Sequence, residues 1–247
     1  MADLIRARPV LLRLLALQAA WSYERMQGIG IAWATEPALR DLFGQNEARY
    51  REALARAALF FNANPYLAAG AIGAELRAEA DSVPGPQVER LRTALCGPLG
   101  ALGDRLFWAG VVPALGAGAA LAIAMGAGPW PVVAAVLVHN AIRLVLGRRL
   151  LRLGWNEGVR IGSAIGASAI PRLGDLAVAA AAFLCGVAVP VAGTWFLRQS
   201  APGELVAVVV FLAAAILLRR LMGPRASPRR LTLIGGAVVI AWHLVNR

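Results

Sequence analysis

The sequence is poor in charged residues and contains no lysine at all. Only 16% of its 247 residues are acidic or basic, whereas soluble domains carry about 25%. Apolar residues make up 59% of the chain, which is too many for an intrinsically disordered protein. These shortages exclude a disordered chain and an ordinary soluble enzyme, and they favour an integral membrane protein.

Cysteine and histidine are also scarce. Cys96 and Cys185 stand alone in apolar stretches, and His139 and His243 lie next to apolar runs, where a lone histidine is typical of a packed or interfacial residue. A zinc site or a disulfide framework needs clustered ligands or cysteines. The sequence has no Ser/His/Asp set and no metal-ligand cluster. We therefore predict no catalytic residue, no metal and no cofactor.

Acidic residues are rare in the second half of the chain. Residues 1–105 carry 12 arginines and 11 acidic residues, whereas residues 106–247 carry 13 arginines and 3 acidic residues. We predict a helical region on the cytoplasmic side or embedded in the membrane over residues 1–105, and a transmembrane region over residues 106–247. The net charge of +11 needs no nucleic-acid partner, because basic loops orient membrane proteins and attract anionic lipid.

Long apolar runs fill the second region. A bilayer core requires about 20 apolar residues in a helix. The predicted fold class is an all-α integral membrane protein, with amphipathic and re-entrant helices in the first half. Arginines between the second and third runs, and between the fourth and fifth, predict that both connections face the cytoplasm. About five membrane-spanning helices are expected, at residues 106–125, 131–146, 176–197, 205–218 and 231–245, and the glycines and prolines of residues 126–131 predict a turn between the first two.

Proline and glycine mark the expected helix boundaries in the first region. We predict a helix over residues 8–33, an interruption at Pro37, and a short helix that ends at Gly44. Asn46 is placed to cap the next helix, which we expect to run to Phe60.

The apolar run at residues 57–73 is interrupted by Asn62, Asn64 and Pro65. Pro65 removes a backbone donor and disfavours helical backbone at Asn64. Transporters place substrate sites at such broken helices, where protein or a cavity covers the irregular backbone. An ordinary turn between two soluble helices is the alternative, and spacing alone does not decide between them.

Glycine recurs at residues 97, 100 and 103, directly before Asp104. This spacing lets backbones approach closely, and neither a preceding strand nor a Gly-Lys-Ser/Thr ending marks a nucleotide loop. Asp104 lies at the mouth of the first predicted span, where an ionisable residue is a candidate functional group. Pairing with Arg105 or with an arginine of a neighbouring helix is the alternative.

Six segments of the sequence occur together in an order that is typical of one family. They are Gln18–Gln27, Leu59–Pro65, Gly97–Asp104, Phe107–Trp108, Asn140–Arg143 and Gly154–Gly158. Together they resemble the IID subunit of the mannose/fructose/sorbose family of the bacterial phosphoenolpyruvate-dependent sugar phosphotransferase system. The sequence departs from the family at Arg105, where members commonly have proline, and in the short connection at residues 198–203.

The resemblance implies a multi-pass protein of the bacterial cytoplasmic (inner) membrane. In this family, IIC and IID form the membrane channel as oligomers of IIC–IID pairs, and cytoplasmic IIA and IIB proteins carry the phosphoryl group. With a IIC subunit, the chain is expected to bind and translocate a hexose-type sugar, without being an enzyme itself. The alternative is a non-transporting structural or regulatory partner of a IIC-like membrane protein.

Amides, carboxylates and aromatic faces are the groups that bind sugars. Trp21, Glu24 and Gln27 fall at spacing i, i+3 and i+6, which would group them loosely on one side of a helix. Packing or an interfacial position is the alternative for Trp21, and a surface ion pair is the alternative for Glu24. The candidate substrate-binding residues are Trp21, Glu24, Gln27, Asn62, Asn64 and Asp104.

Overall fold

The computed structural model describes residues 7–199 and isolated positions between residues 203 and 220. Helices dominate these residues and no named strand occurs among them, which agrees with the predicted all-α class. Two compact units divide the chain, Met1–Pro190 and Val191–Arg247. The elements are α1 (Ala7–Leu14), α2 (Gly28–Phe43), α3 (Glu47–Ala57), α4 (Ala68–Ala80), α5 (Gly85–Gly103), η1 (Asp104–Val111), α6 (Val112–Ala124), α7 (Trp130–Glu157), η2 (Gly158–Arg160), α8 (Ile161–Ala167) and α9 (Ile170–Gln199).

The first two helices differ from the single helix predicted over residues 8–33. α1 ends at Leu14, residues 15–27 form turns and two isolated bridge positions, and α2 begins at Gly28. Close packing with a distant segment accounts for this start, because a Cβ on Gly28 would overlap the carbonyl oxygen of Leu59. Only glycine allows such an approach.

The predicted interruption at Pro37 is also wrong, although the predicted end of the helix at Gly44 is confirmed. α2 runs through Pro37 and is followed by Gly44 as its C-cap. An interior proline costs a helix about 3 kcal/mol. Burial of the apolar face of α2 offsets that cost, because Ile31, Ala34 and Ala38 are fully buried at spacing i, i+3 and i+7.

Asn46 caps α3 as predicted. Its Oδ1 accepts a hydrogen bond from the backbone N–H of Arg49 at 3.1 Å. α3 ends at Ala57, before the predicted end at Phe60, because the Arg92 guanidinium takes the carbonyl groups of this stretch.

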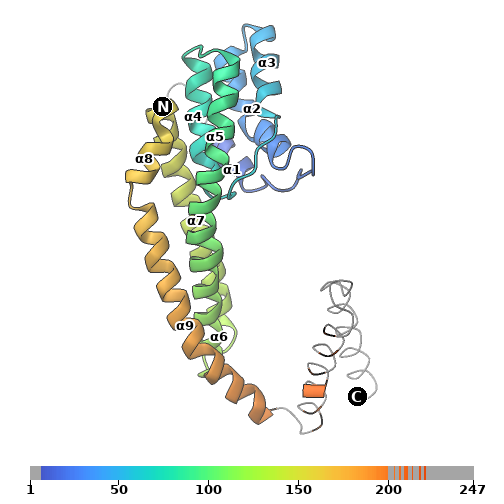
Figure 1. Cartoon of the computed structure of the whole chain (residues 1–247), viewed down its shortest axis with the longest axis vertical. Coiled ribbons are helices and arrows are strands. Elements are labelled where there is room, and N and C mark those ends of the chain that lie inside the picture. The colour runs from blue at the N-terminus through green and yellow to red at the C-terminus, as the bar shows by residue number, and fades with distance from the viewer. Residues whose placement is uncertain are drawn as a thin grey trace. The chain divides into compact units, whose positions relative to one another are not determined.

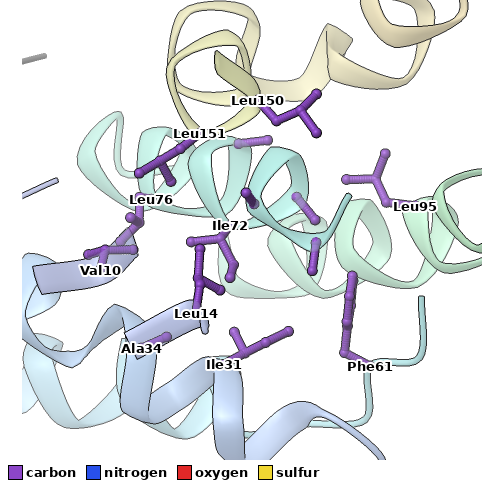
Figure 2. Close-up of a cluster of buried hydrophobic side chains, with 14 of the residues drawn as sticks. Val10, Leu14, Ile31, Ala34, Phe61, Ile72, Leu76, Leu95, Leu150 and Leu151 are labelled. Atoms are coloured by element: carbon purple, nitrogen blue, oxygen red, sulfur yellow. The ribbon is translucent and has the colours of Figure 1, made fainter. Parts of the chain in front are cut away.

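α4 is deeply buried, with eleven of its thirteen residues buried. It crosses α7 through glycines: a Cβ on Gly154 would overlap the carbonyl oxygen of Gly70, and one on Gly73 would overlap the backbone of α7. Figure 2 shows Ile72 and Leu76 of α4 among side chains from α1, α2 and α7. The core therefore forms around α4, and α7 is held against it by backbone contact.

α5, η1 and α6 form one continuous helical run, Gly85–Ala124, which is long and apolar enough to cross a membrane. The boundary that we predict between residues 105 and 106 falls inside this run. Gly126 and Gly128 then adopt positive φ angles of 94° and 63°, which confirms the predicted turn before α7.

α7 extends to Glu157, beyond the predicted end of the second span at Leu146. Three arginines that we expected in a connection therefore lie on a helix. A second run long and apolar enough to cross a membrane covers Trp130–Trp195. The predicted span at residues 231–245, and most of that at 205–218, lie outside the described residues. The three arginines are Arg148, Arg149 and Arg152.

Burial separates α6 from the rest of the first unit. No residue of α6 is buried, and the buried residues of α7 lie between Gly147 and Trp155. Figure 1 shows α6 beside the part of α7 that is remote from α1 to α5. Side chains such as Leu137, which is 65% exposed, cover this part of α7. An apolar surface of this kind needs lipid or a partner protein to cover it.

Candidate functional site

The two segments Gln18–Gln27 and Leu59–Pro65 meet at a short parallel bridge between Met26 and Phe61. The N–H of Gln27 donates to the carbonyl of Phe61 at 2.9 Å. The Gln27 side chain, 3% exposed, continues the ladder: its Nε2 donates to the carbonyl of Ala63 at 2.7 Å, and its Oε1 accepts from the N–H of Ala63 at 3.4 Å. The amide of Gln27 thus satisfies irregular backbone that has no helical partner.

Asn64 connects the same break to the glycine-rich segment. It is 2% exposed, its Nδ2 donates to Oδ1 of Asp104 at 2.9 Å, and its Oδ1 accepts from the N–H of Tyr66 at 3.0 Å. Gly103 makes this possible, because a Cβ there would overlap the Asn64 side chain. Asp104 does not form an ion pair with Arg105, which was one alternative for this residue.

Arg105 instead pairs with Asp175 of α9 at 2.7 Å. Both side chains are more than half exposed, so in water the pair would contribute about 0–1 kcal/mol.

Trp21, Glu24 and Asn62 are exposed. The helical grouping predicted for Trp21, Glu24 and Gln27 is wrong, because residues 15–27 are turns. Trp21 packs edge-on against Tyr23, with ring centroids 4.9 Å apart. The structure therefore joins Gln27, Asn64 and Asp104 through the backbone of the break, and leaves Trp21, Glu24 and Asn62 open to their surroundings.

Arg92 of α5 is a residue that the sequence reasoning missed. It is 2% exposed, and its guanidinium donates to Oε2 of Glu75 at 2.7 Å. Three more hydrogen bonds, of 2.9, 2.9 and 3.2 Å, go to carbonyl groups of the chain between α3 and the break. The available signal was position: Arg92 continues the buried stripe of Val88, Leu95 and Leu99 on α5.

The carboxyl group of Glu75 is the buried partner of Arg92. Its Oε1 has no hydrogen-bond partner among the described residues. Burial raises the pKa of Glu75, and the adjacent guanidinium opposes that shift. A cavity of about 10 Å³ adjoins the pair, which is room for one water molecule.

A cluster of aromatic side chains lies directly beyond the break. The Tyr66 ring contacts Phe107 and Trp108 at centroid distances of 4.2 and 5.5 Å. The hydroxyl of Tyr66 lies 3.2 Å from Nε2 of His139, and the guanidinium of Arg143 lies 5.3 Å from its ring. His139 is packed as expected for a lone histidine, but against a polar group beside a cavity of about 500 Å³.

The helix changes its winding at this cluster. Residues Asp104–Val111 form a π-helical segment, η1, between α5 and α6. Such wide turns are rare and are frequent at functional sites. Here the segment carries Asp104 against Asn64 and carries Phe107 against Tyr66, so two contacts with the break come from one short stretch.

The described residues contain no group of three or more His, Cys, Asp or Glu side chains that could hold a metal ion. The side chains at this site can form hydrogen bonds and aromatic contacts with a ligand beside the irregular backbone of the break.

Known proteins resemble this chain in sequence and in fold. The chain is similar to the mannose-specific EIID component of the phosphotransferase system of Escherichia coli K12, with 30% identity over 190 residues, which cover 74% of this chain and 66% of that protein. The sorbose-specific EIID component of Klebsiella pneumoniae is 31% identical over 179 residues, covering 70% and 64%. The chain thus spans slightly less than two thirds of the length of these relatives.

Solved structures agree. A chain of the mannose transporter ManYZ, determined by cryo-electron microscopy in complex with a microcin, has a TM-score of 0.56 and 27% identity, covering 96% of this chain and 93% of its own. A structure described as that of a membrane protein has a TM-score of 0.68 and 25% identity, covering 98% of both chains. The model of the phosphotransferase-system mannose/fructose/sorbose family IID component matches residues 5–192. The chain therefore belongs to this family of IID components.

Proposed function

We propose that this chain is the IID subunit of a membrane sugar permease that, with a IIC subunit, binds and translocates a hexose-type sugar. Cytoplasmic IIA and IIB proteins would phosphorylate the sugar as it arrives. The observation that carries the proposal is the meeting of three family-like segments at one break: Gln27 from the first, Ala63 and Asn64 from the second, and Asp104 from the third.

The exposed apolar surface supports a multi-pass location in the bacterial cytoplasmic membrane. α6 and the first half of α7 expose apolar side chains that lipid or a second membrane subunit would cover. We propose five spans in all, with the arginine-rich end of α7 on the cytoplasmic side. Oligomers of IIC–IID pairs are the proposed assembly, and the similarity to a chain of the ManYZ transporter supports a membrane partner.

The six candidate residues divide into two roles in this proposal. Gln27 and Asn64 are buried and hold the backbone of the break. Trp21, Glu24 and Asn62 are exposed, and Asp104 is exposed while it holds Asn64. We propose that these four present the groups that meet the sugar.

Sugar uptake by cells that express the chain with its IIC, IIA and IIB partners tests the proposal. Asn62→Ala removes an exposed amide beside the break, so uptake of radiolabelled mannose, fructose or sorbose should fall while the protein still reaches the membrane and co-purifies with IIC. Gln87→Ala, which removes an exposed amide at the start of α5, is the matched control and should transport normally.

The alternative is a structural or regulatory partner of a IIC-like protein. It predicts that substitutions at Asn62, Glu24 and Asp104 leave uptake intact, while deletion of the whole chain removes IIC from the membrane. Normal uptake by Asn62→Ala alone would remove that residue from the site.

A further inference from the structure

The cavity of about 500 Å³ lies between α6 and α7, next to the break. Its walls are mostly apolar, and include the small residues Gly116, Ala119 and Ala120 of α6. Polar atoms gather at one end only. That end is formed by Tyr66, Trp108, His139 and Asn140.

This polar end has unused hydrogen-bonding groups. Nδ2 of Asn140 donates to the carbonyl of Val136 at 2.9 Å, and Nε2 of His139 lies against Tyr66. Within the described part of the chain, Oδ1 of Asn140 and Nδ1 of His139 have no hydrogen-bond partner. The Trp108 side chain is 48% exposed, so its ring offers an aromatic face beside them.

The lining also excludes some ligands. Among the residues that the structure describes, no charged side chain lines the cavity, and a phosphorylated sugar would require arginine or another cation. The volume lies within the range of about 300–1,000 Å³ that is usual for small-molecule sites. A neutral molecule with hydroxyl groups on one side and a C–H face on the other fits the polar end.

The position along α7 is that of a transport site. His139 comes nine residues after Trp130 at the start of α7, which is about 14 Å along the helix axis. If α7 enters the bilayer at that start, the polar end lies near the middle of a hydrocarbon layer about 30 Å thick. Transporters bind substrate at this depth, beside broken helices, and polar residues there are functional by default.

We propose that Tyr66, Trp108, His139 and Asn140 form a subsite for a neutral, unphosphorylated hexose. Trp108 stacks on the C–H face of the ring, and Asn140 and His139 bind its hydroxyl groups. Tyr66 orients His139 and ties the subsite to the break. This assignment rests on the proposed function, whose own candidate residues Trp21, Glu24, Asn62 and Asp104 do not line the cavity.

The test is the kinetics of mannose, fructose and sorbose uptake by cells that carry the complete system. Asn140→Ala leaves hydroxyl groups of the sugar unpaired, and it should raise KM about tenfold with Vmax and membrane abundance close to wild type. Trp108→Leu should act in the same direction. Asn156→Ala removes an exposed amide on the same helix away from the cavity, and it should change neither parameter.

Each other outcome would refute either the subsite or the proposed function. Unchanged KM in Asn140→Ala and Trp108→Leu, with normal transport, would refute the subsite and leave the proposed function standing. Loss of both variants and of Asn140→Gln from the membrane would assign these residues to folding instead. Absence of uptake by wild type would refute the proposed function, and equilibrium binding of radiolabelled hexose to the purified IIC–IID complex would then test the subsite alone. A co-purified phospholipid in the cavity that hexose does not displace would refute it as well.

Discussion

α4 and α6 are two helices of thirteen residues each, both rich in alanine and glycine, and their environments are opposite. α4 contains Glu75, Arg77 and Glu79, yet eleven of its residues are buried. α6 contains no charged residue, yet none of its residues is buried. In water the more apolar helix would be the one inside. The reversal indicates that α6 is suited to a surrounding other than water. The same difference separates the two ends of α7, because its buried residues lie only between Gly147 and Trp155.

The polar residues of α4 are buried because other elements satisfy them. Arg92 binds Glu75, and Arg56 of α3 binds both carboxylate oxygens of Glu79 at 2.8 Å. A bidentate arginine–carboxylate pair is among the stronger interactions in a folded chain. Among the described residues α6 makes no ion pair of this kind, so its stability depends on apolar packing and on whatever covers its exposed face. The two helices thus obtain stability from different sources, and different substitutions should damage each.

The largest effect should come from breaking the buried pair beneath α4. Arg92→Met leaves Glu75 unpaired and three carbonyl groups without their donor, which should lower the free energy of unfolding by about 3–5 kcal/mol. Fluorescence-monitored thermal unfolding in detergent measures this loss. An Arg92→Met protein as stable as wild type would contradict the assigned role of the pair.

Glu75→Gln is the comparison variant at the same pair, and it should cost less, because the amide oxygen can still accept from Arg92 and the three carbonyl groups keep their donor. Burial raises the pKa of Glu75, so the folded state binds a proton more tightly than the unfolded state. The carboxyl group therefore favours folding below its unfolded pKa, and this contribution is lost as pH rises through the folded pKa. Wild type should lose stability relative to Glu75→Gln as pH increases. An opposite slope would show that the arginine outweighs burial.

The second largest effect should distinguish the surroundings of α7 from those of α1. Leu12 of α1 and Leu137 of α7 are each 65% exposed, so they differ in place and not in exposure. Leu137→Asp puts a charge in the part of α7 that we propose to span the membrane, at a cost of about 2.5–3.5 kcal/mol, and it should reduce the amount of chain recovered in the membrane fraction. Leu12→Asp should have a much smaller effect. Equal recovery of the two variants would mean that α7 is not in lipid.

Local chemistry made some features of the fold predictable from sequence. The Asn46 cap, the end of α2 at Gly44 and the turn before α7 follow from residues that act on their immediate neighbours. The start of α2 was not predictable, because Gly28 is constrained by the carbonyl of Leu59. Contacts between distant segments cannot be predicted from the local sequence pattern.

The candidate site shows the same division. Asn64 and Gln27 were recognisable as polar residues in unusual places, but their roles depend on partners 40 and 36 residues away. The contact between Tyr66 and His139 spans 73 residues. A lone histidine beside an apolar run gives no sign of a tyrosine so far away in the sequence.

The smallest of the three effects concerns glycine in the two helices. Gly73 of α4 lies against the backbone of α7, whereas Gly116 of α6 has no atom within 4 Å of an added Cβ. Gly73→Ala should cost about 1–3 kcal/mol through overpacking. Gly116→Ala removes a flexible glycine from a helix and should be neutral or stabilising by up to about 1 kcal/mol. The same change is therefore expected to destabilise α4 but not α6, although the two helices are similar in composition.

Thermal unfolding of the purified chain in detergent, without IIC, measures the effects of Gly73→Ala and Gly116→Ala on stability. If Gly116→Ala proves neutral alone but lowers the yield of the IIC–IID complex, the partner approaches α6 closely at that glycine. A loss of stability by Gly116→Ala in the isolated chain would instead mean that α6 already packs against protein there. The comparison would then fail, because α6 would be buried like α4.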